Sequence, residues 1–267
     1  VWHVRIGRCN TLSGPERSED MCGIGGFARL LRRLRGIASD AQVVYVDSTG
    51  AVTPVRSMLL RLALRSGIWC FDAFDNLVYN YRGLRRLKAQ LAIGLLAHSS
   101  RIVFVLSDET RRLLPLAQHL DNAWDIPRID REGRNWRDLV VLSAIDERFD
   151  FRFVEEVARL SPERRIVLHG FVLHDDPAVQ ESLNSLCARF ANVEFRGRYA
   201  FEEIPAILDP FAIGFTPYAI SEMTEFINPD KYYMFLQGGL EVISTEIPQA
   251  RRMAGRIHIA RAPHDVV

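Results

Sequence analysis

The sequence predicts an α/β protein with mostly parallel sheets. Short apolar runs of strand length alternate along the chain with longer segments in which apolar residues recur at helical spacing. Because this alternation is typical of sheets whose strands are joined by helices, we expect most strands to be parallel. The composition agrees, since the 267 residues are 48% hydrophobic and 25% charged, as in ordinary globular proteins. This length suits two medium domains or one large one.

Nine apolar runs are the predicted strands, and the segments between most of them have the spacing of amphipathic helices. The predicted strands are Val43–Val46, Ile68–Phe71, Ile102–Leu106, Leu139–Leu142, Ile166–Leu168, Val193–Phe195, Ala212–Phe215, Glu241–Ser244 and Ile257–Ile259. The predicted helices include Val55–Leu64, Leu84–Leu96, Phe153–Leu160, Ala178–Phe190 and Glu202–Leu208.

The chain changes character in the segment Ala123–Asp138, which is polar and only weakly periodic. It separates the first three predicted strands from the last six, so we interpret it as an interdomain linker. The expected organisation is an unassigned leader over residues 1–27, a partial first domain over 28–122, the linker over 123–138, and a second domain over 139–267.

The stretch TEFINPDKYYMFLQGGLEVIST predicts a loop, a short helix, a tight turn and a strand. Asn228 is a favoured N-cap and Pro229 a favoured first helical residue, because proline lacks an N–H that would be unpaired there. Gly238 and Gly239 suit the left-handed C-terminal cap. Lys231 then falls in the first helical turn, where the helix dipole disfavours a cation by up to about 1 kcal/mol unless an anion is present.

Two interpretations of Lys231 remain open at this point. A helix N-terminus binds phosphate through its unpaired N–H groups, and a lysine adds a point charge to such a site. Alternatively, Lys231 points into solvent or pairs with Asp230 or Glu225.

Polar residues follow four of the predicted strands, at the ends where open α/β sheets bind ligands. They are Asp47–Gly50, Asp72 with Asp75, Ser107–Glu109, and Ser143–Asp150. Most of them also have a structural alternative. Ser107 has the position of an N-cap followed by acidic residues, and Asp72 can cap or turn the chain.

The two parts of the chain differ in charge. Residues 1–100 contain 14 Lys and Arg against 7 Asp and Glu, whereas residues 101–267 contain 20 against 26. The segments Gly25–Gly36 and Arg82–Lys88 are amphipathic and cationic, and one interpretation is that this half is attracted to an anionic membrane surface. A solvated helix face is the alternative. No aromatic-interleaved basic strand accompanies the arginines, so nucleic acid is not expected as a partner.

Cysteine and histidine patterns do not predict a metal site. The four cysteines are scattered without a CxxC pair, which fits a reducing cytosol. His169, His174, Asp175 and Asp176 form a conceivable ligand set, but LHDDPAV is more typical of a turn with Asp before a helix that starts at proline. The sequence contains neither an apolar stretch long enough to span a bilayer nor a signal-peptide pattern.

Four segments carry a resemblance to a known family, one of which, NVEFRGRYAFEEIPAIL (Asn192–Leu208), resembles the middle of the second domain. In FAIGFTPYAISEMTEFINPDKYYMFLQGGLEVISTEIPQAR (Phe211–Arg251), a strand ending in Pro-Tyr leads to Asn-Pro-x-Lys, a helix, a glycine turn and a Val-Ile strand. Leu139–Gly170 resembles the start of the same domain, and Phe71–Gly83 resembles a segment of the preceding one. Together they resemble the GT-B fold glycosyltransferases of the group 1 (family 4-like) type, over about Ala28 to Pro263.

The resemblance implies two Rossmann-like domains, of which the first is incomplete here, with the closing helices of the second also missing. It implies that a nucleotide-sugar is the donor and that a hydroxyl of a glycan or lipid-linked acceptor receives the sugar, as in bacterial surface polysaccharide or glycolipid synthesis. It implies no cofactor and no required metal. The implied location is cytoplasmic, extending to the inner face of the membrane.

Site residues follow from the resemblance by position. Lys231 would contact the diphosphate together with the helix start at Asn228-Pro229, and Arg148 would be a second phosphate contact. Glu222 or Glu225 would lie near the donor sugar.

The remaining implied nucleotide-sugar contacts are Ser143, Tyr218 and Thr224. If the reaction inverts configuration, the acceptor hydroxyl needs a base, for which Asp75 or Asp72 is the candidate. Retaining enzymes of this fold dispense with that base, and the sequence leaves both outcomes open.

The chain departs from the family pattern at several positions. Met234 replaces a glutamate that holds the ribose in many relatives, and Ser143 replaces the glycine of the first strand-to-helix turn, where a side chain would crowd a phosphate. An alternative function therefore stays open. It is a non-catalytic remnant that binds nucleotide or carbohydrate, or a scaffold partner of a polysaccharide assembly complex.

Overall fold

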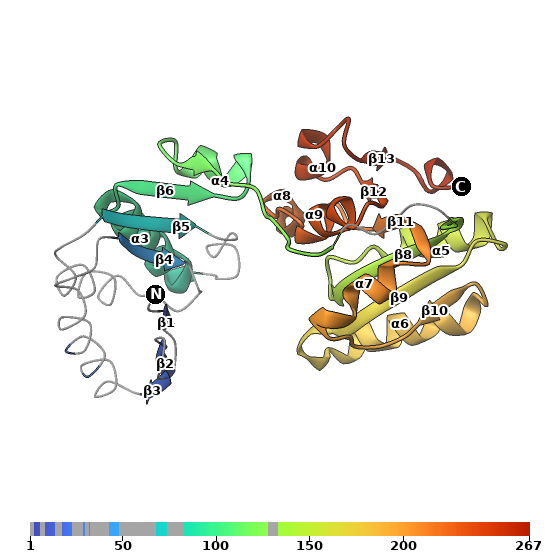
Figure 1. Ribbon diagram of the computed structural model, residues 1–267, viewed down its shortest axis with the longest axis horizontal. Coiled ribbons are helices and arrows are strands. Elements are labelled where there is room, and N and C mark those ends of the chain that lie inside the picture. Colours follow the sequence, from blue (N-terminus) through green and yellow to red (C-terminus); the bar gives the residue numbers. More distant parts are fainter. Residues whose placement is uncertain are drawn as a thin grey trace. The chain divides into compact units, whose positions relative to one another are not determined.

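The computed structural model divides into two compact units, Val1–Asp121 and Asn122–Val267 (Figure 1). Each unit has a parallel sheet of its own. The residues that the structure describes are 3–5, 9–13, 18–22, 29, 32, 43–47, 68–73, 83–127 and 133–267.

The first unit contains a four-stranded parallel sheet in the order β4-β5-β6-β7. Its strands are β4 (Val43–Asp47), β5 (Ile68–Ala73), β6 (Ile102–Val105) and β7 (Gln118–His119), and its helices include α3 (Gly83–Ser99) and α4 (Asp108–Leu113). A separate antiparallel sheet, which the sequence pattern does not predict, consists of β1 (His3–Arg5), β2 (Cys9–Ser13) and β3 (Ser18–Cys22).

Three strands predicted in this unit are confirmed, and so is the helix predicted over Leu84–Leu96. Ser107 is the N-cap of α4 as expected, because its hydroxyl accepts a hydrogen bond from the main-chain N–H of Thr110 at 3.1 Å. Asp72 was expected to follow its strand, which is wrong, since β5 continues to Ala73 and buries Asp72 within it. The predicted helix Val55–Leu64 lies outside the described residues.

The second unit contains a six-stranded sheet in the order β10-β9-β8-β11-β12-β13, with all neighbours parallel. The strands are β8 (Asn135–Ile145), β9 (Ile166–Val172), β10 (Val193–Phe195), β11 (Phe211–Thr216), β12 (Glu241–Thr245) and β13 (His258–Ala260). In this unit the chain first forms the central strand β8. It then adds β9 and β10 on one side of β8, and β11, β12 and β13 on the other side. All six predicted strands are confirmed, and β8 begins before its predicted start.

Helices cover both faces of this sheet (Figure 1). One face carries α5 (Phe151–Leu160) and α6 (Pro177–Arg189), and the other carries α7 (Ile204–Leu208), α9 (Asp230–Gln237) and α10 (Pro248–Arg252). A short helix, α8 (Glu222–Glu225), precedes α9, and the 3-10 helices η1 (Leu173–Asp175), η2 (Phe201–Glu203) and η3 (Pro263–Asp265) complete the unit. The unit is a doubly wound α/β fold.

The two cores alternate along β8, as the period of a strand requires. Leu139 and Val141 pack with the α5 and α6 side chains, whereas Val140 and Leu142 pack with those of α7 and α9. Gly214 of β11 permits the close approach of α9, because an added Cβ would lie 2.4 Å from the ring of Phe235. A larger residue at this position would push α9 away from the sheet.

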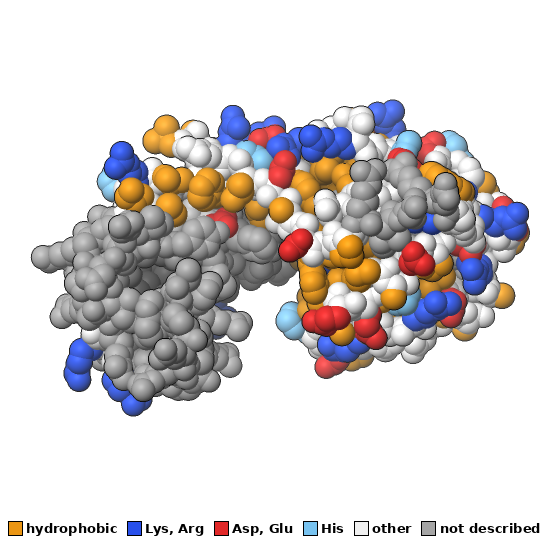
Figure 2. Space-filling model, viewed as in Figure 1, with side chains coloured by type: hydrophobic (Ala, Val, Ile, Leu, Met, Phe, Trp, Pro, Cys, Tyr) orange, Lys and Arg blue, Asp and Glu red, His pale blue; other side chains and the backbone are white. Residues whose placement is uncertain are grey.

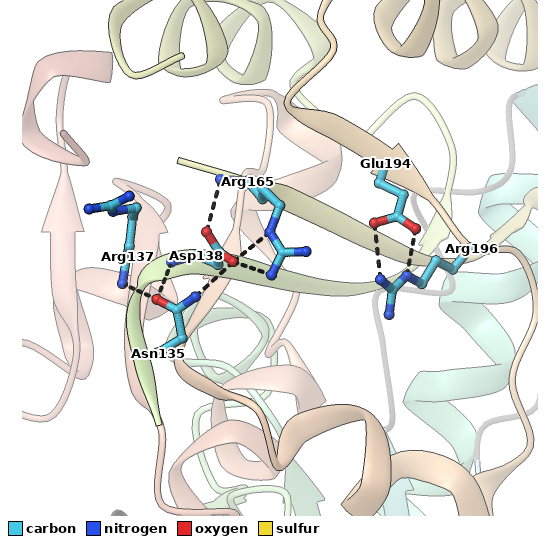
Figure 3. Close-up of polar contacts among 6 residues, drawn as sticks. All are labelled: Asn135, Arg137, Asp138, Arg165, Glu194 and Arg196. Atoms are coloured by element: carbon cyan, nitrogen blue, oxygen red, sulfur yellow. Dashed lines mark hydrogen bonds and ion pairs between the residues drawn. The ribbon is translucent and has the colours of Figure 1, made fainter. Parts of the chain in front are cut away.

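Polar contacts tie the amino ends of β8 and β9 together (Figure 3). The buried carboxylate of Asp138 accepts hydrogen bonds from Nδ2 of Asn135 at 2.8 Å and from Nε of Arg165 at 2.7 Å. The exposed pair Glu194 and Arg196 lies on the β10 side of the sheet. Asn135, Asp138 and Arg165 are at the edge opposite to the carboxyl ends of β8 and β9.

In the described part of the chain, no helix is both long enough and apolar enough to cross a bilayer.

Candidate active site

The candidate site lies where the strand order reverses, at the carboxyl ends of β8 and β11. Doubly wound sheets bind ligands in this place, because the loops on the two sides of the reversal turn away from each other. Here the loop after β8 is joined to the loop after β11 by two main-chain hydrogen bonds. The N–H of Ala219 donates to the carbonyl of Arg148 at 2.8 Å, and that of Asp150 donates to the carbonyl of Pro217 at 2.9 Å.

Tyr218 stands at the centre of this region. Its N–H donates to Oγ1 of Thr245 at 2.9 Å, and the same hydroxyl donates to its carbonyl at 2.7 Å, so the residue is fixed to the end of β12. Burial raises the pKa of the Tyr218 phenol, and Tyr232 and Asp230 raise it further, whereas Arg148 lowers it. The phenol is therefore within electrostatic reach of both the loop after β8 and the first turn of α9.

Arg148 is held by a neighbour in its own loop. Its Nε and Nη2 atoms donate to the two carboxylate oxygens of Asp146 at 2.9–3.0 Å and 2.6 Å, which is a bidentate ion pair. The main-chain N–H of Arg148 also donates to Asp146 at 2.9 Å. Since a bidentate pair fixes the plane of the guanidinium group, Arg148 is oriented before any ligand binds.

Helix α9 begins at Asp230, one residue later than expected. Asn228 was expected to be the N-cap, but the N-cap is Pro229, which has extended backbone angles, and no side chain caps the helix. The main-chain carbonyl of Asn228 instead accepts a hydrogen bond from Nδ2 of Asn122 at 2.9 Å. At the other end of α9, Gly239 has a φ of 81°, which is the left-handed conformation expected of the glycine pair.

Lys231 lies in the first turn of α9, as expected, and its ammonium group has two partners. Nζ is 2.9 Å from Oδ2 of Asp230 and 5.7 Å from the centroid of the Trp124 ring. This pairing with Asp230 was one of the partners expected for Lys231 if no phosphate is bound. An ammonium group has three N–H donors, so this pairing leaves donors for a second acceptor.

The two candidate glutamates lie on α8, in the loop region between β11 and α9. Glu222 and Glu225 are both exposed, which leaves their carboxylates accessible to a ligand. Thr224 differs from the expectation, since it is buried and its hydroxyl donates to the carbonyl of Ala219 at 2.6 Å. It also accepts from the N–H of Ser221, so Thr224 holds the α8 loop together and does not face a ligand.

Other expected site residues lie elsewhere. Ser143 was expected in the turn after its strand, but it lies within β8, where it pairs with Gly170 and its hydroxyl donates to the carbonyl of Ala144. Asp72 is buried in β5 of the first unit, and Asp75 lies outside the described residues.

Met234 occupies the position on α9 where the resembled family often has a glutamate that holds the ribose. Its side chain is 1% exposed and packs in the core beneath α9. A ribose hydroxyl would not reach this residue in the present arrangement.

Three aromatic residues on or near α9 were not among the site residues expected from the sequence. Tyr232 is buried, and its hydroxyl lies 2.5 Å from Oγ of Ser244. Tyr199 has its pKa raised to about 12, mainly by burial and further by the charge of Asp230. Trp124 stacks on Phe201 with ring centroids 5.4 Å apart. Tyr199 follows a predicted strand and was detectable from that position, whereas Trp124 lies in the predicted linker, where no local pattern marks it.

The cluster considered as a metal site has another structure. Asp176 caps α6 by accepting from the N–H of Ala178 at 2.9 Å, which confirms the predicted turn before a proline-initiated helix. His169 is buried, and burial followed by the charge of Arg196 lowers its pKa. Among the residues that the structure describes, no group of three His, Cys, Asp or Glu side chains is arranged to hold a metal ion.

Comparison with solved structures shows which known fold this architecture resembles. The chain superimposes on Anabaena HepE in complex with UDP and glucose with a TM-score of 0.67 and 14% identity, over 91% of this chain and 70% of HepE. The fold is that of the GT-B glycosyltransferases. A second GT-B structure, the UDP-forming α,α-trehalose-phosphate synthase of Burkholderia vietnamiensis, matches with a TM-score of 0.59 and 11% identity, over 91% of this chain and 70% of the synthase.

Sequence comparison gives a relative that is named a putative glycosyltransferase. The chain is 28% identical over 123 residues to the putative teichuronic acid biosynthesis glycosyltransferase TuaH of Bacillus subtilis strain 168. This match spans 46% of the chain and 30% of the Bacillus protein, so the chain corresponds to less than a third of that relative. No family model matches the chain.

Proposed function

We propose that this chain functions as a glycosyltransferase that moves a sugar from a nucleotide-diphosphate donor to a hydroxyl acceptor. One observation carries the proposal. Where the strand order of the second unit reverses, the Arg148 loop is hydrogen-bonded to the residues on both sides of Tyr218, and the segment that follows Tyr218 leads into the first turn of α9 with Lys231. A doubly wound sheet binds nucleotides at this point, and cations there suit a diphosphate.

The chemistry assigned to the two cations is charge stabilisation. As the bond between the sugar and the diphosphate breaks, negative charge develops on the leaving nucleoside diphosphate. Lys231 and Arg148 would stabilise that charge, helped by the positive end of the α9 helix dipole. Because these groups supply the positive charge, we propose that the reaction requires no metal or other cofactor.

The glutamates of α8 are proposed to face the donor sugar. Glu222 and Glu225 are exposed and lie on the segment that joins the two nucleotide-binding elements, β11 and α9. The acceptor base, if the reaction inverts configuration, is proposed to be Asp75. Asp72 is not retained for this role, because its carboxylate is buried inside β5.

The names of the relatives guide the choice of substrate class. HepE is solved with UDP and glucose, the trehalose-phosphate synthase is described as UDP-forming, and TuaH is assigned to teichuronic acid biosynthesis. We therefore propose a UDP-sugar donor and a glycan or lipid-linked acceptor of bacterial surface polysaccharide synthesis, handled in the cytoplasm.

We propose that helix α3 attaches the protein to an anionic membrane surface. Its leucines form one stripe at helical spacing, with Leu84, Leu87, Leu91 and Leu95 exposed by 75%, 51%, 53% and 43%. The same helix contains Arg85, Arg86 and Lys88 and has no acidic residue. An exposed apolar stripe with flanking cations is typical of helices that lie in the membrane interface.

Figure 2 shows acidic and basic side chains interspersed over the described surface of the second unit, with no extended area of one sign on that face. Co-sedimentation with anionic and with neutral vesicles tests the attachment. Binding to anionic vesicles should be lost when Leu87 and Leu91 are both changed to Ser, and equal binding of that variant would contradict the assignment.

The donor site is tested by thermal unfolding with UDP, GDP, CMP and dTDP at concentrations up to the millimolar range. A ligand at about 100 times its Kd adds roughly 2.7 kcal/mol to the stability, which is a measurable shift. A shift with UDP, followed by release of UDP from a UDP-sugar, supports the enzyme. Binding of UDP without hydrolysis or transfer would favour a non-catalytic binding protein, and no shift with any nucleotide would contradict the donor site.

A further inference from the structure

We infer that Trp124 is a positioning residue of the donor site, which holds the ammonium group of Lys231 where it meets the diphosphate. The inference rests on the proposed function, because it assumes that Lys231 binds the donor. Trp124 belongs neither to the loop after β8 nor to the segment between β11 and α9, so the inference adds a third part of the chain to the proposed site.

The segment 122–127 runs along α9 and is fixed at both ends. Near the start of the helix, Nδ2 of Asn122 donates to the main-chain carbonyl of Asn228 at 2.9 Å. Near its end, Nε2 of Gln237 donates to the carbonyl of Ile126 at 3.4 Å, and the side chain of Ile126 is 3% exposed in the core beneath α9. Trp124 lies between these anchors and is therefore held beside the first turns of the helix.

The indole ring of Trp124 is fixed on one side and faces a cation on the other. Phe201 of η2 stacks on it with an interplanar angle of 21°. Nζ of Lys231 lies 5.7 Å from the ring centroid, which is within the range of a cation–π interaction. Asp230 contacts the same ammonium group at 2.9 Å, so the cation is confined between a carboxylate and an aromatic face.

This arrangement has an energetic consequence for ligand binding. A lysine side chain loses rotamer freedom when its ammonium group is ordered, and a ligand that has to order it binds more weakly. Lys231 is already confined, with its side chain only 17% exposed. Trp124 thus improves diphosphate binding by acting on Lys231, without touching the ligand.

The test is a double-mutant cycle on UDP binding, measured by isothermal titration calorimetry. Trp124→Leu keeps an apolar side chain against Phe201 but removes the aromatic face, and we expect the Kd to rise about three- to tenfold. Trp124→Phe keeps an aromatic face and should stay within about twofold of the original. In a Lys231→Met background, Trp124→Leu should change the Kd by less than about twofold, because the cation is absent.

Matched controls separate this role from general damage. Trp136, on β8, is 53% exposed, and Trp136→Leu should leave UDP binding unchanged. An equal loss for Trp124→Leu in both backgrounds would overturn the inference, as would a loss for Trp124→Phe as large as that for Trp124→Leu. If Lys231→Met alone leaves the Kd unchanged, the proposed donor site itself fails. If Lys231→Met weakens binding but Trp124 shows no coupling, only the inference fails.

Discussion

The guanidinium group of Arg134 donates a hydrogen bond to the main-chain carbonyl of Gly238 at 2.9 Å, and a second to that of Gly239 at 3.2 Å. These carbonyls lie at the C-terminal end of α9, where helix carbonyls lack partners within the helix and the dipole attracts a cation. Arg134 therefore fixes the end of the helix whose first turn contains Lys231.

Replacing Arg134 should destabilise the protein. The residue is 8% exposed, so Arg134→Ala would remove two charge-assisted hydrogen bonds from a buried place. We expect a loss of about 2–3 kcal/mol in the free energy of unfolding, measured by urea denaturation. Arg134→Lys keeps the charge but not the two-pronged geometry and should fall in between. A loss below about 0.5 kcal/mol in the alanine variant would contradict a structural role.

Lys231→Ala should weaken UDP binding by about 1.5–3 kcal/mol, the range for charge-assisted contacts. Lys88 is the only other lysine in the sequence, which makes Lys88→Ala a matched control that should bind UDP normally. The same pair permits a second measurement. UDP should protect Lys231, but not Lys88, against an amine-reactive reagent, as followed by mass spectrometry.

The two ion pairs in Figure 3 should differ in their contribution to stability. The side chain of Asp138 is 4% exposed and binds Arg165 and Asn135, so Asp138→Ala leaves several donors without a partner. We expect a cost of about 1–3 kcal/mol from the lost hydrogen bonds, because the Arg165 side chain is 57% exposed and can be hydrated without Asp138. The pair Glu194–Arg196 is roughly half exposed on both sides, and Glu194→Ala should cost less than about 1 kcal/mol. Similar losses in urea denaturation would refute this distinction.

The buried His169 should make stability depend on pH. Burial, followed by the charge of Arg196, lowers its folded-state pKa below the ordinary value near 6.5, although Glu194 and Glu203 oppose the shift. The unfolded chain therefore binds the proton first as the pH falls. This contribution to stability is complete above pH 6.5 and is lost as the pH falls through the folded-state pKa. Thermal unfolding midpoints can be measured between about pH 7.5 and 5.5. As the pH is lowered, the midpoint should fall more steeply for the original protein than for His169→Gln.

Gly214→Ala should destabilise the second unit by about 1–3 kcal/mol, the usual cost of overpacking. The added methyl group would collide with the ring of Phe235. Gly255→Ala is not a suitable control, because Gly255 has a φ of 92°. Gly94→Ala is suitable, since nothing lies within 4 Å of its added Cβ and helix α3 should gain from alanine there. Thermal unfolding of the two variants should shift in opposite directions.

The sheet of the second unit was predictable because its strands are short apolar runs between amphipathic segments. Val140–Leu142 and Val167–Leu168 are apolar on consecutive positions, as expected for strands that are covered on both faces. Strand ends were less predictable. Asp72 looks like a turn residue, but pairing with its neighbours extends β5 past it, and no local pattern reports such tertiary pairing.

The candidate site was predictable only in its local part. Lys231 was recognised because Asn-Pro-Asp-Lys marks a helix start, and the helix does begin there within one residue. The partner that faces Lys231 could not be found in this way, since Trp124 lies more than a hundred residues earlier in the sequence. Thr224 was misassigned for a related reason, because its hydroxyl is used by the fold of its own loop.

The central position of β8 has a consequence for how the second unit folds. Leu139 of β8 pairs with Ile213 of β11, about 70 residues later in the chain. At a synthesis rate of about 5–20 residues per second, the ribosome needs roughly 4–15 seconds to synthesise the residues between β8 and β11, and during this time one edge of β8 has no neighbouring strand. Contacts of such sequence separation also slow refolding. During that interval the apolar edge of β8 is open, and we expect nascent chains that end before β11 to be the species that chaperones bind.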